Sequence, residues 1–289
     1  SNDFNLIDRN IDFLFDGKIS FEGSFHGRTM GTISAAGSRK LMEGFGPRLP
    51  GFDLIKKLSL DSVEKKISKQ TCAILVEPIL GEGGIVTLSC SFLRGLKELC
   101  KKYKLLLIFD EVQSGIGRSG HFLSHESCRV TPDIVALAKG LGNGFPIGAC
   151  LATEEVSSSM VPGTHGSTYG GNPLGCAVAL ETIKHIVKPE FLFTIRRKGD
   201  FFKERLHGLL EKFPEQILDV RGRGLMLGLK CVSKNVHLID MCRKEKLLLV
   251  PGASNTVRIL PPLTITYEEI KEAIKRLERA LLRMRKLNE

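Results

Sequence analysis

Short apolar runs alternate with longer amphipathic stretches through the first part of the chain. The runs are bounded by Gly, Pro or charged residues and predict strands at KISFEG (18–23), CAILVEP (72–78), LLLIFDE (105–111), DIVALAKG (133–140) and IGACLAT (147–153). The helical period predicts helices at DSVEKKIS (61–68), with Asp61 as the N-cap, and at SFLRGLKELCKKY (91–103). Strands separated by helices in this way form a mainly parallel sheet.

The pattern changes after about residue 175. Helices are predicted at 175–187, 191–213 and 266–284, a glycine-broken hairpin at 217–231, and short strands at 247–252 and 256–263. This mixture is typical of a second, smaller α+β domain. We therefore expect a large α/β domain over residues 1–188 and a small domain over residues 189–289.

Composition places the chain among globular proteins. Of the 289 residues, 42% are hydrophobic and 26% are charged, which is ordinary for a folded chain. No apolar run approaches the ~18 residues that a membrane span needs. The first ten residues, SNDFNLIDRN, lack the pattern of a signal peptide, so a cytoplasmic location is expected.

The cysteines and the charge argue against two other classes of protein. None of the eight cysteines forms a CxxC pair, and this spacing predicts reduced thiols and no metal site. The net charge of +10 comes from basic residues that mix with Glu and Leu on helix-like stretches such as IKEAIKRLERALLRMRK. Such stretches are typical of solvated helix faces, so we expect no nucleic-acid binding.

Charged residues stand where the predicted strands end. Glu77 and Asp110 each close a strand, and Lys139 follows the next one. A buried carboxylate is costly without a cation, and a lysine shielded from solvent would have a lowered pKa and act as a nucleophile; the plainer alternative is a solvent-facing loop lysine. Together, this acid and this lysine suit pyridoxal phosphate, whose aldehyde binds a lysine and whose pyridinium nitrogen binds a carboxylate.

Five segments closely resemble the class III, ornithine-type pyridoxal-phosphate aminotransferases. They are SFHGRTMGTISAAG (24–37), VEPILGEGG (76–84), FDEVQSGIGRSG (109–120), PDIVALAKGLGNGFPIGA (132–149) and HGSTYGGNPLGCAVAL (165–180). The resemblance implies the type I pyridoxal-phosphate transferase fold, with a mostly parallel sheet of the seven-stranded type and a smaller α+β C-terminal domain. The branch most similar to this chain is that of acetylornithine aminotransferase.

The resemblance also implies roles around the cofactor. Lys139 would form the Schiff base with the cofactor aldehyde and then move a proton, and Asp110 would pair with the pyridine nitrogen. Val112 and Phe25 would pack on opposite faces of the ring, while Gln113 would approach its phenolic oxygen.

Further residues carry over from the same motifs. Glu111 counts among the cofactor-binding residues, and Glu77 would support the surroundings of the ring. Ser167 and Thr168 would reach the phosphate and substrate region of a neighbouring subunit, which implies a homodimer with shared active sites. Without the resemblance, Ser167 and Thr168 would be taken as part of a polar turn.

Substrate recognition would fall to two arginines and one acid. Arg258 resembles the residue that clamps the α-carboxylate of the substrates, a task suited to a two-pronged donor. Arg28 resembles the family's contact to acetylornithine. Glu82 resembles a gate that pairs with Arg258 and moves aside for a dicarboxylate.

The implied reaction moves the δ-amino group of N-acetylornithine to 2-oxoglutarate, a step of arginine biosynthesis. Ornithine, succinylornithine and 4-aminobutyrate aminotransferases stay open as alternatives, as does a truncated, non-catalytic paralogue. The last arises because family members carry a long segment before FHGRT, with a helix N-terminus that cradles the phosphate. SNDFNLIDRNIDFLFDG (1–17) has no such motif, so we expect this segment to be missing from the sequence.

Overall fold

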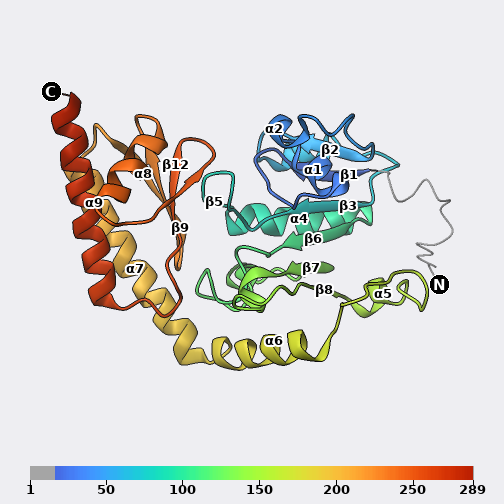
Figure 1. Ribbon diagram of the computed structural model, residues 1–289. Coiled ribbons are helices and arrows are strands. Elements are labelled where there is room, and N and C mark those ends of the chain that lie inside the picture. Colours follow the sequence, from blue (N-terminus) through green and yellow to red (C-terminus); the bar gives the residue numbers. More distant parts are fainter. Residues whose placement is uncertain (1–16, 289) are drawn as a thin grey trace. The chain divides into compact units, whose positions relative to one another are not determined.

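The computed structural model describes residues 17–288 and forms two compact units (Figure 1). The first unit contains residues up to Pro78, Leu88–Gln113 and His125–Thr182. The second contains Ile79–Thr87, Ser114–Ser124 and the chain from Ile183 onward. Two short segments that precede the boundary expected at residue 188 thus belong to the second unit. The N-terminal stretch that we noted as unlike the family lies, except for Gly17, outside the described residues.

A six-stranded sheet with the order β2-β1-β3-β6-β7-β8 forms the centre of the first unit (Figure 1). Its strands are β1 (Lys18–Phe21), β2 (Phe52–Ile55), β3 (Ala73–Val76), β6 (Leu106–Asp110), β7 (Ile134–Leu137) and β8 (Ala149–Ala152). All neighbours pair in parallel except β7 and β8, which are antiparallel. The mainly parallel sheet is confirmed, with six strands among the described residues where the seven-stranded type was expected.

The helices of the first unit are short, apart from two. They are α1 (Met30–Ala36), α2 (Arg39–Met42), α3 (Leu60–Glu64), α4 (Cys90–Tyr103), α5 (Glu154–Ser157) and α6 (Pro173–Ile186), with 3-10 turns η2 (Ser124–Cys128) and η3 (Lys139–Leu141). Helix α6 spans the point where the chain passes into the second unit. The expected N-cap Asp61 is wrong: Ser59 caps α3, because its hydroxyl accepts the backbone N–H of Ser62 at 3.3 Å, and Asp61 lies in the first turn.

Both faces of the six-stranded sheet carry helices. On one face, Leu93 and Leu96 of α4 share a buried core with Phe21 of β1 and Phe109 of β6. Neighbouring side chains of a strand point to opposite faces, so Ser20 faces away from this core. Its hydroxyl donates to the carbonyl of Ala35 in α1, which places α1 on the other face.

An antiparallel sheet with the order β11-β12-β10-β9 forms the second unit. It contains β9 (Ile217–Arg223), β10 (Met226–Cys231), β11 (Val250–Gly252) and β12 (Thr256–Ile259), with helices α7 (Pro189–Lys212), α8 (Asn235–Lys244) and α9 (Tyr267–Asn288). A two-stranded hairpin of β4 (Ile79–Leu80) and β5 (Val86–Thr87) joins this unit, since Ile79 and Ile85 pack against Met226. Helix α8 was not anticipated from the sequence.

One disulfide contradicts the expectation that all thiols are reduced. Cys90 and Cys128 are bonded across a sequence separation of 38 residues. Their pairing depends on how α4 and η2 meet in space, which no spacing rule for close cysteine pairs reveals. The other six cysteines are free thiols.

Candidate active site

Polar residues gather at the carboxyl edge of the six-stranded sheet. Strands β1, β3, β6 and β7 are parallel neighbours, so their C-terminal ends lie along the same edge. Glu77 follows β3, Asp110 ends β6, and Lys139 stands two residues after β7. This edge is where open α/β sheets bind ligands.

Asp110 is buried and already has hydrogen-bonding partners in the chain. Its Oδ2 lies 2.8 Å from Nδ1 of His26, and its Oδ1 accepts the backbone N–H of Val112 at 3.1 Å. His26 is therefore a partner of Asp110 within the chain, whereas the sequence pattern had pointed to the cofactor alone. His26 belongs to the SFHGRTMG motif after β1, but its approach to Asp110 crosses 84 positions of sequence.

Glu77 fixes the backbone next to His26. Its Oε2 accepts the backbone N–H of Phe25 at 2.9 Å, and the side chain is buried. The guanidinium carbon of Arg28 lies 5.3 Å from the centre of the Phe25 ring, and Arg28 itself is exposed. The loop after β1 is thus held on two acids at neighbouring strand ends, Glu77 and Asp110.

Glu111, the residue after Asp110, contacts the turn η2. Its side chain is fully buried, and Oε1 lies 2.7 Å from Nδ1 of His125 and accepts the backbone N–H of His125 at 2.9 Å. The His125 ring packs on Phe109, with ring centres 5.4 Å apart. Glu111 therefore holds η2 to the end of β6, and its role at the cofactor stays a prediction.

Two buried polar atoms near Asp110 have no hydrogen-bond partner in the described part of the chain. They are Nε2 of His26 and Oε1 of Gln113. A buried polar atom without a partner is costly, so such atoms mark places where a polar ligand would be stabilised. Val112, between Asp110 and Gln113, is half-buried.

Lys139 is exposed, which corrects the expectation that it is shielded from solvent. It follows β7 in a loop rich in glycine and has a positive φ of 46°, uncommon for a residue with a side chain. No hydrogen bond or ion pair joins its ammonium to another described residue. The desolvation that would make it a nucleophile is therefore not provided by the described residues of this chain.

Ser167 and Thr168 lie in a segment, residues 161–171, in which every residue is exposed. The hydroxyl of Ser167 accepts the backbone N–H of Gly170 at 3.1 Å, as in a polar turn. The exposed segment also carries Tyr169, and Met160 precedes it. Their contact with a neighbouring subunit stays a prediction.

Arg258 and Glu82 form a pair within the second unit. Arg258 lies on β12 and is buried, and its Nη1 donates to Oε1 of the half-exposed Glu82 at 2.6 Å. Its Nε donates to the carbonyl of Pro251 at 3.1 Å. Glu82 stands in the turn between β4 and β5, where Gly84 has a φ of +102° and an added Cβ would lie 2.7 Å from the carbonyl oxygen of Ala253. The turn therefore requires glycine at position 84, two residues after Glu82.

The comparison with protein families decides the identity. The family model for aminotransferase class III matches residues 16–281, nearly the whole chain. The chain belongs to the class III aminotransferases.

Within the described residues, no group of three His, Cys, Asp or Glu side chains is placed so that it could hold a metal ion. None of the described helices combines the length and the apolar character of a membrane span.

Several class III aminotransferases resemble this chain along most of its length. The acetylornithine aminotransferase of Mesorhizobium japonicum is 48% identical over 259 residues, which cover 90% of this chain and 65% of that protein. The acetylornithine aminotransferase of Rhodobacter capsulatus is 47% identical and is covered to 67% of its length. The chain thus spans about two thirds of the length of these relatives.

Solved structures of class III aminotransferases share the fold. The ornithine aminotransferase of Toxoplasma gondii, with PLP at partial occupancy in its active site, has a TM-score of 0.89 and 33% identity over 94% of this chain and 65% of its own. The N-acetylornithine aminotransferase of Stenotrophomonas maltophilia has a TM-score of 0.79 and 32% identity, and the match covers 94% of this chain and 67% of the other.

Class III aminotransferases depend on pyridoxal phosphate, and the strand-end residues fit that group. Asp110 offers a fixed carboxylate, His26 and Gln113 offer buried polar atoms without partners, and Lys139 offers a free primary amine. All four lie in the first unit, at the C-terminal ends of the parallel strands β1, β6 and β7.

Proposed function

We propose that this chain acts as a pyridoxal-phosphate aminotransferase that moves the δ-amino group of N-acetylornithine to 2-oxoglutarate, in arginine biosynthesis and in the cytoplasm. The observation that carries the proposal is the buried carboxylate of Asp110 at the end of β6, which is hydrogen-bonded to His26. Strand β6 pairs with β7, the strand that leads to Lys139. The identity of 48% to an acetylornithine aminotransferase supports this substrate over the related amino donors.

Besides Lys139, five residues would hold the cofactor, which when bound supplies an electron-accepting ring. Asp110 would keep the ring nitrogen protonated, and Phe25 and Val112 would pack on the two faces of the ring. Gln113 would approach the phenolic oxygen, and Thr168 would reach the phosphate. His26 acts as a positioning residue, because its hydrogen bond fixes the carboxylate of Asp110.

Lys139 is the proposed catalytic residue. Its amine would hold the cofactor aldehyde and, when released by the substrate, would be available to hold and move a proton. The exposed Lys139 side chain can turn toward a ligand without first breaking a hydrogen bond to a described residue. Shielding from water would then come from the bound cofactor, the substrate and a partner subunit.

Arg258, Glu82 and Arg28 would select the substrates. Arg258 would bind a substrate carboxylate through two parallel hydrogen bonds. When the substrate has a neutral tail, Arg258 would keep its hydrogen bond to Glu82. A dicarboxylate such as 2-oxoglutarate displaces Glu82, whose half-exposed side chain is free to move outward. Arg28, exposed beside Phe25, contacts acetylornithine.

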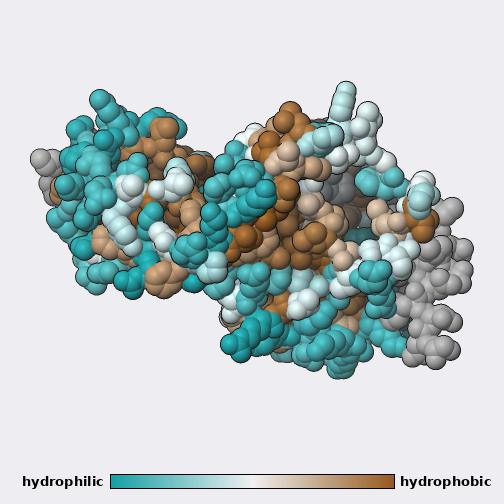
Figure 2. Space-filling view, turned by 90° about the horizontal axis from the view of Figure 1, so that it is seen from below, coloured by the Kyte–Doolittle hydropathy of each residue, from teal (hydrophilic) through white to brown (hydrophobic). Residues whose placement is uncertain are grey.

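A homodimer with shared sites is part of the same proposal. The segment at 161–171 with Ser167 and Thr168 is exposed, and so are the apolar side chains of Met160, Tyr169, Leu174 and Leu180 in the first unit. Figure 2 shows a face of the molecule on which apolar side chains (brown) are exposed among hydrophilic ones (teal). Exposed apolar surface of this kind marks interfaces.

Mixed dimers test the shared site. If each site takes Lys139 from one subunit and Thr168 from the other, inactive Lys139→Ala and Thr168→Ala chains regain activity when mixed. Random exchange would restore about a quarter of the native activity, because half of the dimers are mixed and each has one intact site. Mixing that restores no activity would contradict the shared site.

The absorption spectrum with pyridoxal phosphate tests the enzyme itself. We expect a yellow band that N-acetylornithine bleaches and that is absent from the Lys139→Ala variant. Lys69→Ala, which removes an exposed lysine from the connection before β3, is the matched control and keeps the band. Bleaching by ornithine or 4-aminobutyrate alone would overturn the substrate, and the lack of any band would overturn the proposed activity of this chain.

A further inference from the structure

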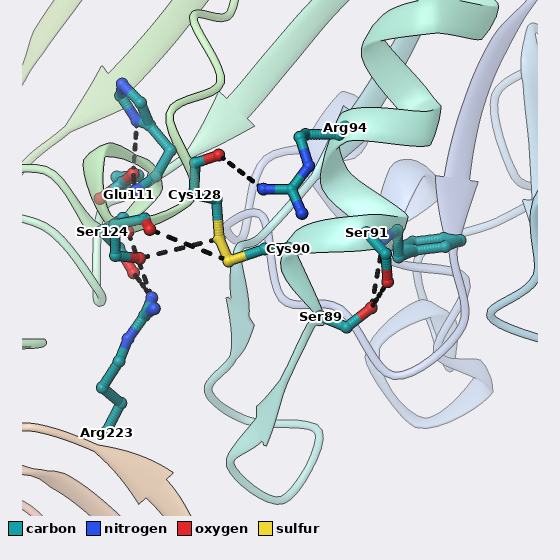
Figure 3. Close-up of a disulfide and its surroundings, with 11 residues drawn as sticks. Ser89, Cys90, Ser91, Arg94, Glu111, Ser124, Cys128 and Arg223 are labelled. Atoms are coloured by element: carbon teal, nitrogen blue, oxygen red, sulfur yellow. Dashed lines mark hydrogen bonds and ion pairs between the residues drawn. A yellow bond between two sulfur atoms is a disulfide. The ribbon is translucent and has the colours of Figure 1, made fainter.

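The disulfide between Cys90 and Cys128 ties the main helix of the first unit to the turn that follows β6 (Figure 3). Cys90 is the first residue of α4, and Cys128 is the last residue of η2. Their Cα atoms are 4.9 Å apart, within the range that a disulfide requires. The loop that it closes contains β6 and its terminal acids.

The turn held by this disulfide is the one that contacts the end of β6. His125, three residues before Cys128, binds Glu111 through both its ring and its backbone nitrogen. Glu111 directly follows Asp110, the residue on which the proposed cofactor site depends. His125 and Cys128 belong to the same turn, η2, so a change at Cys128 can reach the strand end through the two contacts of His125 with Glu111.

We propose that Cys90 and Cys128 form a reversible redox site, oxidised by low-molecular-weight disulfides, whose state sets how firmly the end of β6 is held. The site consists of two cysteines of unequal access. Cys90 is half-buried and Cys128 is almost fully buried, so a small reagent meets Cys90 first. Cys90 also stands at the N-terminus of a 14-residue helix, a position that favours the thiolate.

The exchange is balanced without any further reactant. The Cys90 thiolate attacks one sulfur of the small disulfide, breaks its S–S bond and releases one thiolate. The Cys128 thiolate then attacks Sγ of Cys90 and releases the second. Two protein thiols are oxidised, the small disulfide is reduced to two thiols, and the protons of the protein thiols pass to those products.

Most other cysteines are poor competitors. Burial raises the pKa of Cys100 and of Cys242 to about 12 and that of Cys231 to about 11, so these thiols remain protonated and unreactive. Cys150 and Cys176 are exposed and would react singly with a reagent. Replacing these two with Ser gives a background in which the proposed pair can be followed.

A second contact keeps η2 in place when the disulfide opens. Nη1 of Arg94, one turn further along α4, donates to the carbonyl of Cys128 at 3.2 Å (Figure 3). Reduction therefore leaves this hydrogen bond between α4 and Cys128, together with the packing of Cys128 in the core that it shares with Leu93 and Leu96. We expect it to loosen the turn rather than unfold the unit, which is what a reversible site needs.

The test is a redox titration of the Cys150→Ser/Cys176→Ser chain in buffers of reduced and oxidised glutathione. Differential alkylation and mass spectrometry give the state of each cysteine, and the melting temperature and hydrogen exchange of residues 106–113 give the consequence. We expect Cys90 and Cys128 to pair, the oxidised form to melt higher by on the order of 5 °C, and exchange at 106–113 to slow. Cys90→Ser in the same background should abolish all three responses.

Each other outcome overturns the proposal. If Cys90 and Cys128 still react with the alkylating reagent in excess oxidised glutathione, they do not form a disulfide and no redox site exists. If Cys90 pairs with another cysteine, the assignment of Cys128 as its partner is wrong. A disulfide that forms without changing melting or exchange shows that it does not hold the strand end. None of these readouts needs bound cofactor, so they test the redox site independently of the proposed aminotransferase activity. The titration of the chain that keeps Cys90 and Cys128 is decisive even if the Cys90→Ser variant folds poorly.

Discussion

Arg258 donates a hydrogen bond to Glu82 at 2.6 Å across 176 positions of sequence, within a single compact unit. The pair neutralises a buried guanidinium in the absence of any substrate. In the proposed function, a substrate carboxylate would therefore compete with Glu82 for Nη1 of Arg258. Substitutions of Glu82 and of Arg258 should therefore change the KM for 2-oxoglutarate in opposite directions.

The substitution Glu82→Gln should strengthen the binding of 2-oxoglutarate. It removes the competing charge while keeping the shape, so the KM for 2-oxoglutarate should fall several-fold, on the order of 1 kcal/mol. The half-reaction with N-acetylornithine should slow, because its neutral tail would meet an uncompensated arginine. Stopped-flow measurement of each half-reaction checks this; Glu43→Gln, an exposed acid of the first unit, is the control, and an unchanged KM would contradict the gate.

The substitution Arg258→Lys should weaken the binding of 2-oxoglutarate. Lysine keeps the charge but loses the planar fork that binds a carboxylate through two hydrogen bonds. We expect the KM for 2-oxoglutarate to rise roughly 10- to 100-fold, with a smaller effect on cofactor affinity. Steady-state kinetics and a separate cofactor titration distinguish the two, and a loss of cofactor affinity with unchanged KM would refute the assignment.

His26 should affect the cofactor more than the substrate. His26→Ala leaves Asp110 without the partner at 2.8 Å, so its carboxylate can rotate and the affinity for pyridoxal phosphate should fall about 10-fold. His26→Asn, which keeps an N–H near the position of Nδ1, should recover part of that loss. Equilibrium titration of the visible band measures both, and equal affinities of the native and Ala variants would rule out the positioning role.

Glu245 should make stability depend on acidity in the second unit. Its hydrogen bond with Arg279 is the main cause of a lowered pKa; burial opposes this effect, and the charges of Arg283, Arg279 and Arg276 lower the pKa further. Because the folded pKa lies below the unfolded one, the stabilisation is full above the ordinary carboxyl value of about 4.3 and is lost as the pH falls through the folded pKa.

The Glu245→Gln variant reads out this contribution. Native chain and variant should differ in melting temperature at pH 6, and the difference should shrink steadily below about pH 4.3. Glu211→Gln, which removes an exposed acid of α7, is the control and should track the native chain. A difference that persists unchanged into acid would show that Glu245 acts through packing rather than charge.

Leu96 should be important for the stability of the first unit. It is fully buried in the core between α4 and the sheet, so Leu96→Ala should cost about 2–5 kcal/mol of unfolding free energy through lost burial and a cavity. Leu248→Ala removes a leucine that is 82% exposed and should cost about 0.5 kcal/mol or less. Urea unfolding compares the two, and similar midpoints would contradict the core assignment.

Local patterns in the sequence predicted the elements well. Five apolar runs bounded by Gly, Pro or charge contain β1, β3, β6, β7 and β8; β1, β3, β6 and β7 are short and apolar because they are largely buried, whereas β8 is mostly exposed. The N-cap of α3 could not be predicted in this way, since Ser59 and Asp61 are both good caps and only the backbone geometry chooses between them.

Contacts between distant segments could not be predicted in the same way. The family motifs singled out Asp110 and Glu82, but the bond of His26 to Asp110 and the pairing of Cys90 with Cys128 depend on how separate elements meet. The exposure of Lys139 likewise depends on what covers the loop after β7, which the run of apolar residues before it does not specify.

The second unit is assembled from three separate stretches of chain, so the chain passes between the units five times. A protease cut after Thr182 would leave residues 79–87 and 114–124 on the N-terminal fragment, although they pack with the C-terminal one. Ile79 and Ile85 would still bury Met226, and Arg118 would still donate to the carbonyls of Leu225 and Pro261. The two pieces of a nicked chain should therefore remain together, and neither unit can be transplanted into another protein by a single splice.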